Sequence, residues 1–222
     1  MAQIYQGEQF YENGDYKEAQ IIFDKILIQL DNKSDKYCFT LTKLGRCLYR
    51  QNKLEEAQLC YQQGLKIAAK QLNKSQLIER QIGLLHTDLA DTLVVMGDYN
   101  EARKSYKIGL QITEQQKDPR QLAIIKGQIG ILDLIQKDLE PAEKYLLETI
   151  SIFHQINEPK HEAIYLNELA FLYKDNLELD KAEENYRKAV KIQEQQDLVE
   201  SARIYNNLGN LNCSMGKHNE AE

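Results

Sequence analysis

The sequence predicts an all-α protein, a right-handed superhelical solenoid built from antiparallel helix pairs. Three observations predict this fold class. A small residue recurs at a nearly constant spacing along the 222 residues. No run of alternating β-branched residues, which would be typical of a strand, is visible. The chain has 3 prolines and 11 glycines, a composition that permits long helices.

The recurring residue is an alanine that lies in the second helix of each predicted pair. The copies are Ala19, Ala57, Ala102, Ala142, Ala182 and Ala221, at spacings of 38, 45, 40, 40 and 39 residues. Four residues after the first five lie Phe23, Tyr61, Tyr106, Leu146 and Tyr186, and twelve residues before each alanine lies Gly7, Gly45, Ala90, Gly130, Ala170 or Gly209. Because two helices that cross closely need small residues where their backbones approach, these positions predict the crossing point of each pair.

Turn signals separate the helices in chain order. Gly14 and Gly97 are expected to end helices, with Asp15 and Asp98 as N-caps of the helices that follow. Asp118-Pro119 and Glu158-Pro159 place proline where a new helix would begin. Pro141 is expected in the first turn of the second helix of the fourth repeat, where its missing N–H costs little.

These signals predict a single array over residues 1–222. Its repeats cover approximately 1–33, 34–73, 74–118, 119–157, 158–197 and an incomplete 198–222. Only Glu222 follows Ala221, so the last second helix would be cut after about one turn. Solenoids normally finish with a polar capping element, and none is visible at either end. We therefore expect a fragment of a longer protein, whose other part could hold a catalytic or output domain.

Composition and charge restrict the partner classes. The formal net charge of −6 disfavours a broad nucleic-acid or anionic-membrane surface. No stretch reaches the roughly 18 apolar residues of a membrane span, and the first residues do not resemble a signal peptide. The four cysteines (Cys38, Cys47, Cys60 and Cys213) have no metal-ligand spacing and are expected to be free thiols. A cytoplasmic location is expected.

The residue pattern resembles the tetratricopeptide repeat (TPR) family. The segment "LTKLGRCLYRQNKLEEAQLCYQQGL" of the second repeat and the fifth repeat carry the resemblance best. The period is longer than the usual 34 residues and is similar to that of kinesin light chain-like and bacterial signalling or sensor TPR proteins. Four positions depart from the family pattern: Asp133 and Asn212 at the aromatic position, and Lys137 and Leu177 at the turn glycine. The fourth and sixth repeats are therefore expected to pack less regularly.

No catalytic or cofactor motif is visible. The four histidines (His86, His154, His161 and His218) are dispersed over different repeats without paired-ligand spacing, and His86 is expected in the core. No P-loop, GxSxG or GxGxxG motif occurs. The sequence thus predicts no enzyme activity, no cofactor and no metal site.

The resemblance implies that the first helix of each pair lines a concave groove. The partner-binding positions that it implies are Thr42, Arg46, Tyr49, Arg50, Thr87, Asp91, Ile131, Leu134, Asn167, Phe171, Lys174, Asn206 and Asn210, with Phe39 and Leu84 at equivalent positions. Arg46 and Arg50 suit a carboxylate or, equally, acidic neighbours within the chain. Asn206 and Asn210 lie four residues apart and suit a peptide backbone. Ile131, Leu134 and Phe171 form apolar groove surface or belong to tighter superhelical packing.

The sequence therefore predicts a non-catalytic scaffold that binds a protein or peptide in its concave groove, as the interaction or sensor segment of a larger signalling protein. Neither nucleic acid nor a membrane is expected as a partner. Two alternatives stay open. One is the regulatory arm of a multidomain ATPase or protease, and the other is a module that self-associates through uncapped ends.

Overall fold

The computed structural model describes residues 2–32, 34–70, 76–194 and 198–216, and within these residues the chain is helical, without a strand. The helices of the described part are α1 (Ala2–Glu12), α2 (Tyr16–Gln29), α3 (Asp35–Arg50), α4 (Leu54–Ala69), α5 (Gln76–Met96), α6 (Tyr99–Gln116), α7 (Pro119–Ile135), α8 (Leu139–Gln155), α9 (Pro159–Asp175), α10 (Leu179–Glu194) and α11 (Leu198–Ser214). The predicted all-α class is confirmed.

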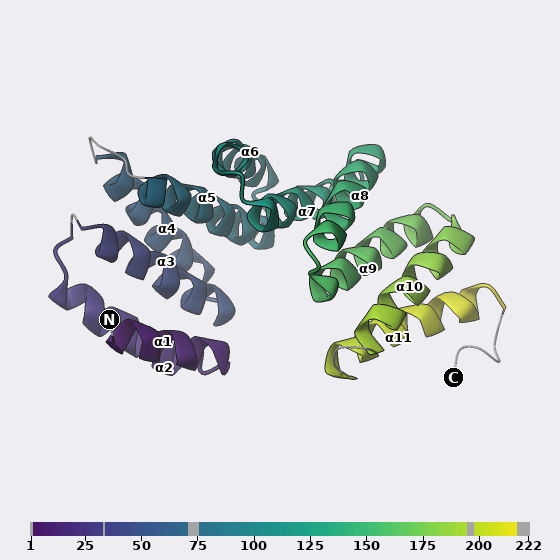
Figure 1. Cartoon of the computed structure of the whole chain (residues 1–222), viewed down its shortest axis with the longest axis horizontal. Coiled ribbons are helices and arrows are strands. Elements are labelled where there is room, and N and C mark those ends of the chain that lie inside the picture. The colour runs from purple at the N-terminus through teal and green to yellow at the C-terminus, as the bar shows by residue number, and fades with distance from the viewer. Residues whose placement is uncertain (1, 33, 71–75, 195–197, 217–222) are drawn as a thin grey trace. The chain divides into compact units, whose positions relative to one another are not determined.

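The chain forms two compact units, Met1–Lys117 and Asp118–Glu222. In the first unit, α1 packs with α2, α3 with α4 and α5 with α6, and the first helices α1, α3 and α5 also contact one another in that order. In the second unit, α7 packs with α8, α9 with α10 and α11 on α10, and α7 contacts α9. Figure 1 shows the helices of each unit stacked pair upon pair. Each unit is thus a stack of antiparallel helix pairs.

The predicted crossing points lie at the centre of each pair. Ala19, Ala57, Ala102, Ala142 and Ala182 are fully buried. The large side chains four residues later, among them Tyr61 and Tyr106, are buried as well. A Cβ added at Gly45 would overlap the ring of Tyr61, which explains why a glycine stands there. The last copy, Ala221, lies outside the described residues.

Turns between the helices use the left-handed backbone region. Gly14 and Gly97 have φ of 87°, as expected of glycines that end a helix. The equivalent turn positions in other repeats are Asn52, Lys137 and Leu177, with φ of 61°, 64° and 61°. The turn geometry is therefore retained where the glycine is replaced, at the cost of backbone strain.

The predicted helix starts are confirmed in position but differ in how they are capped. Asp15 and Asp98 occupy the N-cap positions of α2 and α6, yet their side chains accept no capping hydrogen bond. Asp118 does cap α7, because its Oδ1 accepts from the backbone N of Gln121 at 3.0 Å. Pro119 and Pro159 begin α7 and α9, and Pro141 is the third residue of α8.

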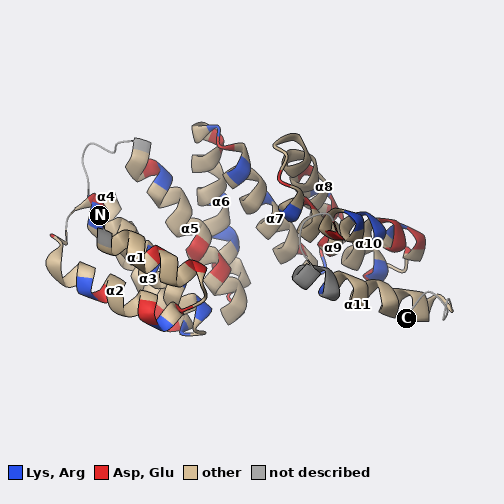
Figure 2. Ribbon diagram, turned by 60° about the horizontal axis from the view of Figure 1, so that its bottom comes forward, with Lys and Arg blue, Asp and Glu red and all other residues tan. Residues whose placement is uncertain are grey.

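Two of the four cysteines, Cys38 and Cys47, are buried. All four cysteines are free, and burial raises the pKa of the Cys38 thiol to about 11 and that of Cys47 to about 12. Figure 2 shows Lys and Arg interleaved with Asp and Glu along the helices of both units. Among the described residues, no helix combines the length and apolar character needed to cross a bilayer.

Candidate functional site

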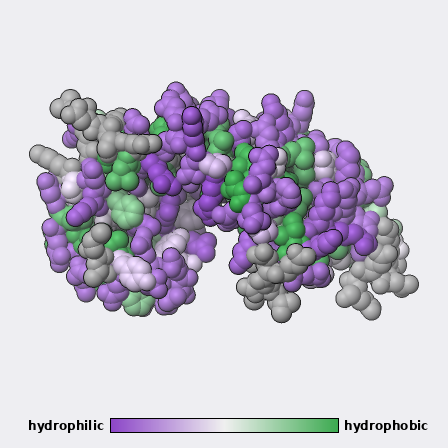
Figure 3. Space-filling model, viewed as in Figure 1, coloured by the Kyte–Doolittle hydropathy of each residue, from purple (hydrophilic) through white to green (hydrophobic). Residues whose placement is uncertain are grey.

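A hollow of about 480 Å³ lies where the first helices of the first unit meet. We call it the α1–α3–α5 pocket. Its lining is Ile4 of α1, Asp35, Lys36 and Phe39 of α3, and Leu77, Ile78, Arg80, Gln81 and Leu84 of α5. Figure 3 shows apolar surface among hydrophilic atoms on the face of this unit that α3 and α5 form. The volume is in the range of about 300–1,000 Å³ that is typical of ligand pockets.

The starts of α3 and α5 position this lining. Ser34 caps α3 through its Oγ, which accepts from the backbone N of Tyr37 at 3.2 Å, so Lys36 and Phe39 fall on the first turns. Helix α5 has 21 residues, whereas α3 has 16. The extra length of α5 brings Ile78, which is 2% exposed, and Leu77, which is 70% exposed, beside the start of α3.

A polar contact joins α3 and α5 at Gln81, one of the lining residues of the pocket. Gln81 Nε2 donates to Thr42 Oγ1 at 2.5 Å, and the Thr42 hydroxyl donates to the Cys38 carbonyl at 3.1 Å. Thr42 is buried. Thr87, one of the other predicted groove residues, is also buried, and its hydroxyl donates to the Gly83 carbonyl at 2.9 Å. Thr42 therefore links α3 to α5, whereas the hydroxyl of Thr87 is bonded within α5.

A charged cluster follows the pocket along α3 and α5. Arg46 Nε donates to Asp88 Oδ2 at 2.7 Å, and the Tyr106 hydroxyl donates to Asp91 Oδ1 at 2.5 Å. Burial raises the pKa of both carboxyl groups, and the charge of Asp88 adds to this at Asp91, whose pKa is raised to about 7. The Asp88 charge raises the pKa of Arg46, although burial opposes this. Arg46 therefore pairs with an acidic neighbour within the chain.

Two further cations of α3 are also engaged. Lys43 Nζ lies 2.7 Å from Glu8 Oε1 and 5.1 Å from the centre of the Phe39 ring. Arg50 donates from Nε and Nη2 to the Tyr16 hydroxyl at 3.1 and 3.0 Å. A smaller hollow of about 160 Å³ lies beside Lys43 and Arg46, against Glu8, Tyr11, Glu12 and Phe23.

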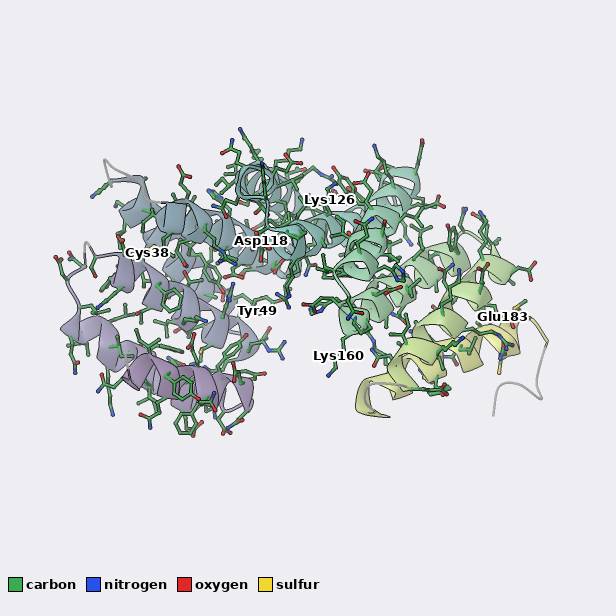
Figure 4. All side chains as sticks on the ribbon, viewed as in Figure 1. Cys38, Tyr49, Asp118, Lys126, Lys160 and Glu183 are labelled. Atoms are coloured by element: carbon green, nitrogen blue, oxygen red, sulfur yellow. The ribbon has the colours of Figure 1, made fainter. Side chains whose placement is uncertain are left out.

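Tyr49 marks the other end of this face. It is half-buried, and burial raises the pKa of its hydroxyl. Figure 4 shows Cys38 toward the start of α3 and Tyr49 toward its end. The predicted residues of the first unit thus follow α3 and α5. Thr42 and Thr87 are buried, Arg46, Tyr49 and Asp91 are half-buried, and Arg50 is exposed.

In the second unit, the predicted residues separate into buried and exposed groups. Leu134 and Asn167 are buried. Asn167 Oδ1 accepts from Asn207 Nδ2 of α11 at 2.9 Å, so its amide links α9 to α11. Ile131 is half-buried and packs against the core of this unit.

The remaining predicted residues of the second unit are accessible. Phe171 is 39% exposed, with Lys174 Nζ 5.7 Å from its ring centre. Asn206 and Asn210 are exposed on α11, one turn apart. The predicted site residues are therefore divided between two units, and each unit presents its own first-helix face.

The sequence pattern did not identify Lys36, Lys43, Ile78, Arg80, Asp88 and Asn207. Lys36, Ile78 and Arg80 lie before the first position that the family pattern assigns to the groove. One signal was present, since the spacing of 45 residues between Ala57 and Ala102 is the longest in the chain. The partners Asp88 and Asn207 carried no signal, because a contact between repeats depends on how the helices are rotated.

The structure brings no three potential metal ligands together among the residues that it describes. His86 is half-buried, burial lowers its pKa, and its Nδ1 makes no hydrogen bond. His154 and His161 face Glu162 and Glu158, at 3.2 and 2.9 Å. His218 lies outside the described residues.

The geometry defines the class of protein as an α-solenoid of helix pairs. A family model described as tetratricopeptide repeat matches residues 1–70 and 160–222, more than half of the chain. The chain therefore belongs to the tetratricopeptide repeat family, as the sequence pattern predicted. No curated protein matches it in sequence.

Solved structures confirm the fold. BtubC (BKLC) from P. vanneervenii aligns with a TM-score of 0.72 at 17% identity, over 99% of this chain and 85% of its own. A second structure is a Signal Transduction ATPase with Numerous Domains protein with a tetratricopeptide repeat sensor, from Pyrococcus horikoshii. It aligns with a TM-score of 0.76 at 18% identity, over 95% of this chain and 31% of its own. A Rap protein complexed with Competence and Sporulation Factor aligns with a TM-score of 0.76 at 14% identity, over 99% of this chain and 71% of its own.

Proposed function

We propose that the chain is a non-catalytic scaffold that binds a protein or peptide partner on the faces of its first helices. The observation that carries this proposal is the α1–α3–α5 pocket, which three first helices form together and which apolar side chains line. Small concave sites with apolar walls and a few polar groups are the preferred binding places of proteins. The Rap protein complexed with a factor supports the same use of this fold.

The test uses Phe39, which lines the pocket and is half-buried. Random peptides displayed on phage are selected on the immobilised chain, and their binding to Phe39→Ser is then measured. We expect affinity to fall at least about tenfold, a loss of about 1.4 kcal/mol. Ile28→Ser is the matched control, because Ile28 is 85% exposed on α2 and does not line the pocket. Circular dichroism verifies that both variants are folded.

Equal binding of the selected peptides to Phe39→Ser and to wild type would place recognition elsewhere and overturn the proposal. The predicted partner-binding residues on the second unit, including Phe171, Asn206 and Asn210, belong to the same proposal. Their accessible positions on α9 and α11 support it.

A second candidate is the sensor arm of a larger signalling protein, such as an ATPase, in the cytoplasm. The Pyrococcus horikoshii protein with a tetratricopeptide repeat sensor favours it, since this chain spans about a third of that protein. A nucleotide-binding or protease signature in the complete reading frame is the expected finding. Self-association through the ends is a third role, and light scattering that shows mass rising with concentration would support it.

A further inference from the structure

Another hollow, of about 440 Å³, lies between α4, α5 and α6. We call it the α4–α5–α6 pocket. Its apolar lining residues are Leu65 and Ala69 of α4, Ile82 of α5, and Ile108 and Ile112 of α6. Its volume is in the range of about 300–1,000 Å³ that is typical of ligand pockets. It shares no lining residue with the α1–α3–α5 pocket, so it is a separate site.

Two glycines hold α5 and α6 close together beside this pocket. A Cβ added at Gly83 would lie 3.2 Å from Cγ2 of Ile112, so the Ile112 side chain uses the space that Gly83 leaves open. A Cβ added at Gly109 would lie 3.3 Å from the Gly83 carbonyl oxygen and 3.7 Å from Cβ of His86. The α5 and α6 sides of the pocket are therefore positioned by close helix packing.

One polar side chain of the lining has an unused hydrogen-bonding atom. His86 is half-buried, and its buried Nδ1 makes no hydrogen bond with the described part of the chain. A buried polar atom without a partner destabilises a folded protein, so a ligand that supplies the missing hydrogen bond gains affinity. Rotation of the imidazole by half a turn about its Cβ–Cγ bond exchanges Nδ1 with Cδ2, which lets the nitrogen turn toward a ligand.

The charges of the lining select against anions. Burial lowers the pKa of His86, so its imidazole is neutral at pH 7. The other polar lining residues among those described are Glu79 and Gln115, both exposed, and none is Lys or Arg. An anionic ligand would meet the Glu79 carboxylate without a compensating cation from the lining. A hydroxyl group both donates and accepts, so it can pair with either tautomer of a neutral imidazole.

We propose that the α4–α5–α6 pocket binds a small uncharged molecule that combines an apolar body with one hydroxyl group. The apolar body lies against Leu65, Ile82, Ile108 and Ile112, and the hydroxyl group forms a hydrogen bond with His86. Burial of the apolar body supplies most of the affinity, and the hydrogen bond fixes which end of the molecule faces α5. This site goes beyond the proposed function, since it takes a small molecule and lies apart from the pocket that contains Phe39.

The test uses the full chain with ¹³C-labelled isoleucine δ1 methyl groups, and 2-naphthol is the probe. We expect 2-naphthol to shift the methyl resonances of Ile82, Ile108 and Ile112 in NMR spectra. The resonance of Ile28, which is 85% exposed on α2 and does not line the pocket, should stay in place. Naphthalene, which lacks the hydroxyl group, should shift the same three resonances. The anion 2-naphthoate should leave them unchanged.

The variant His86→Phe keeps a ring at this position and removes both nitrogens. We expect it to lower the ratio of the naphthalene Kd to the 2-naphthol Kd at least about fivefold, because only 2-naphthol loses a hydrogen bond. Naphthalene binding by the variant shows that the pocket is intact. The matched control is His154→Phe, which changes an exposed histidine of α8 and should leave the ratio unchanged.

A second variant tests the place of binding. Ile108 is 42% exposed, so Ile108→Trp adds volume at the pocket without disturbing the core. It should weaken the binding of both 2-naphthol and naphthalene at least about tenfold. Binding of both molecules as tightly as by wild type would place the site elsewhere and overturn the inference.

Four further results would also overturn it. They are the absence of shifts at the three pocket isoleucines, shifts at Ile4 and Ile78 of the α1–α3–α5 pocket in their place, an unchanged ratio in His86→Phe, and binding of 2-naphthoate as tight as that of 2-naphthol. None of these results bears on the proposed function, because Phe39 does not line the α4–α5–α6 pocket.

Discussion

At the residue scale, the contact between Gly45 and Tyr61 shows why the family pattern needs a small residue in the first helix. Gly45 is buried in α3, and the Tyr61 ring of α4 occupies the space of its missing side chain. A similar contact occurs between Gly7 and Phe23, where an added Cβ would lie 2.8 Å from the ring. The aromatic ring and the glycine are therefore one packing unit.

This contact predicts that Gly45→Ala destabilises the protein. In an exposed helix the same change stabilises by roughly 0.5–1 kcal/mol, but overpacking in a core costs about 1–3 kcal/mol. Here the new methyl group must displace the Tyr61 ring, so we expect a net loss of about 1–2 kcal/mol in the free energy of unfolding. Urea unfolding measures it, and unchanged or higher stability would contradict the packing described.

The second residue-scale prediction concerns Asp91. Its pKa in the folded protein, about 7, lies above the ordinary value of 3.8. The folded state therefore holds this proton more tightly, and the stability that it contributes is complete below about pH 4 and is lost as the pH rises through 7. Each pKa unit corresponds to about 1.4 kcal/mol, so the total is of the order of a few kcal/mol.

Asp91→Asn is expected to remove this pH dependence. The amide oxygen can still accept from the Tyr106 hydroxyl, and the repulsion between Asp91 and Asp88 disappears. The other groups that face this carboxyl, Arg46 and Tyr49, remain. Thermal melts at pH 5 and pH 8 should show a larger stabilisation of the variant at pH 8 than at pH 5.

At the element scale, the left-handed turn sets where each second helix begins. Gly14, Asn52, Gly97, Lys137, Leu177 and Gly216 all have positive φ. Each lies five residues before a copy of the repeating alanine, so the turns repeat with the spacing of the alanines. Where Lys137 and Leu177 stand in place of glycine, the turn keeps its geometry, but the left-handed backbone conformation costs more free energy.

This geometry predicts that Leu177→Gly stabilises the chain. Leu177 has a φ of 61° and is 82% exposed, so the change relieves strain and removes little packing. A left-handed residue other than glycine costs about 1–2 kcal/mol, partly offset by the greater freedom of glycine in the unfolded chain. We expect a gain of about 0.5–1 kcal/mol by urea unfolding. The reverse change, Gly97→Leu, should lower stability, and the opposite signs would refute this explanation.

Contacts between neighbouring first helices also repeat. Lys43 pairs with Glu8, Arg46 with Asp88 and Asn207 with Asn167, each about one period away along the chain. Lys43–Glu8 is partly exposed, and an ion pair of this kind contributes little free energy, about 0–1 kcal/mol. Asn167 is buried, so its contact with Asn207 is of a different kind. All three contacts link a first helix to that of the next repeat.

At the scale of the whole molecule, the division into two compact units has a consequence for folding. In a solenoid each repeat contacts only its neighbours, so stability is approximately a sum over repeats and their interfaces. The first unit contains three complete helix pairs with their own buried alanines and aromatic residues. It therefore has the contacts needed to fold alone.

We expect a fragment of residues 1–117 to be folded. Its circular dichroism should show the helical content expected for α1–α6, and it should melt cooperatively. If the peptides selected by the full chain bind the α1–α3–α5 pocket, the fragment should bind them as well. An unfolded fragment would show that the first unit depends on the rest of the chain.

The sequence by itself determined the helix pairs, their crossing points and most of their ends. These features depend on contacts within a repeat of about 40 residues and on steric needs that a residue type reveals, such as Gly45 beneath an aromatic ring. Tertiary structure alone decided which side chains reach the surface. Thr42 and Thr87 are buried, while Lys36 and Arg80 border the pocket, because the rotation of each first helix and the extra length of α5 are set by packing between repeats.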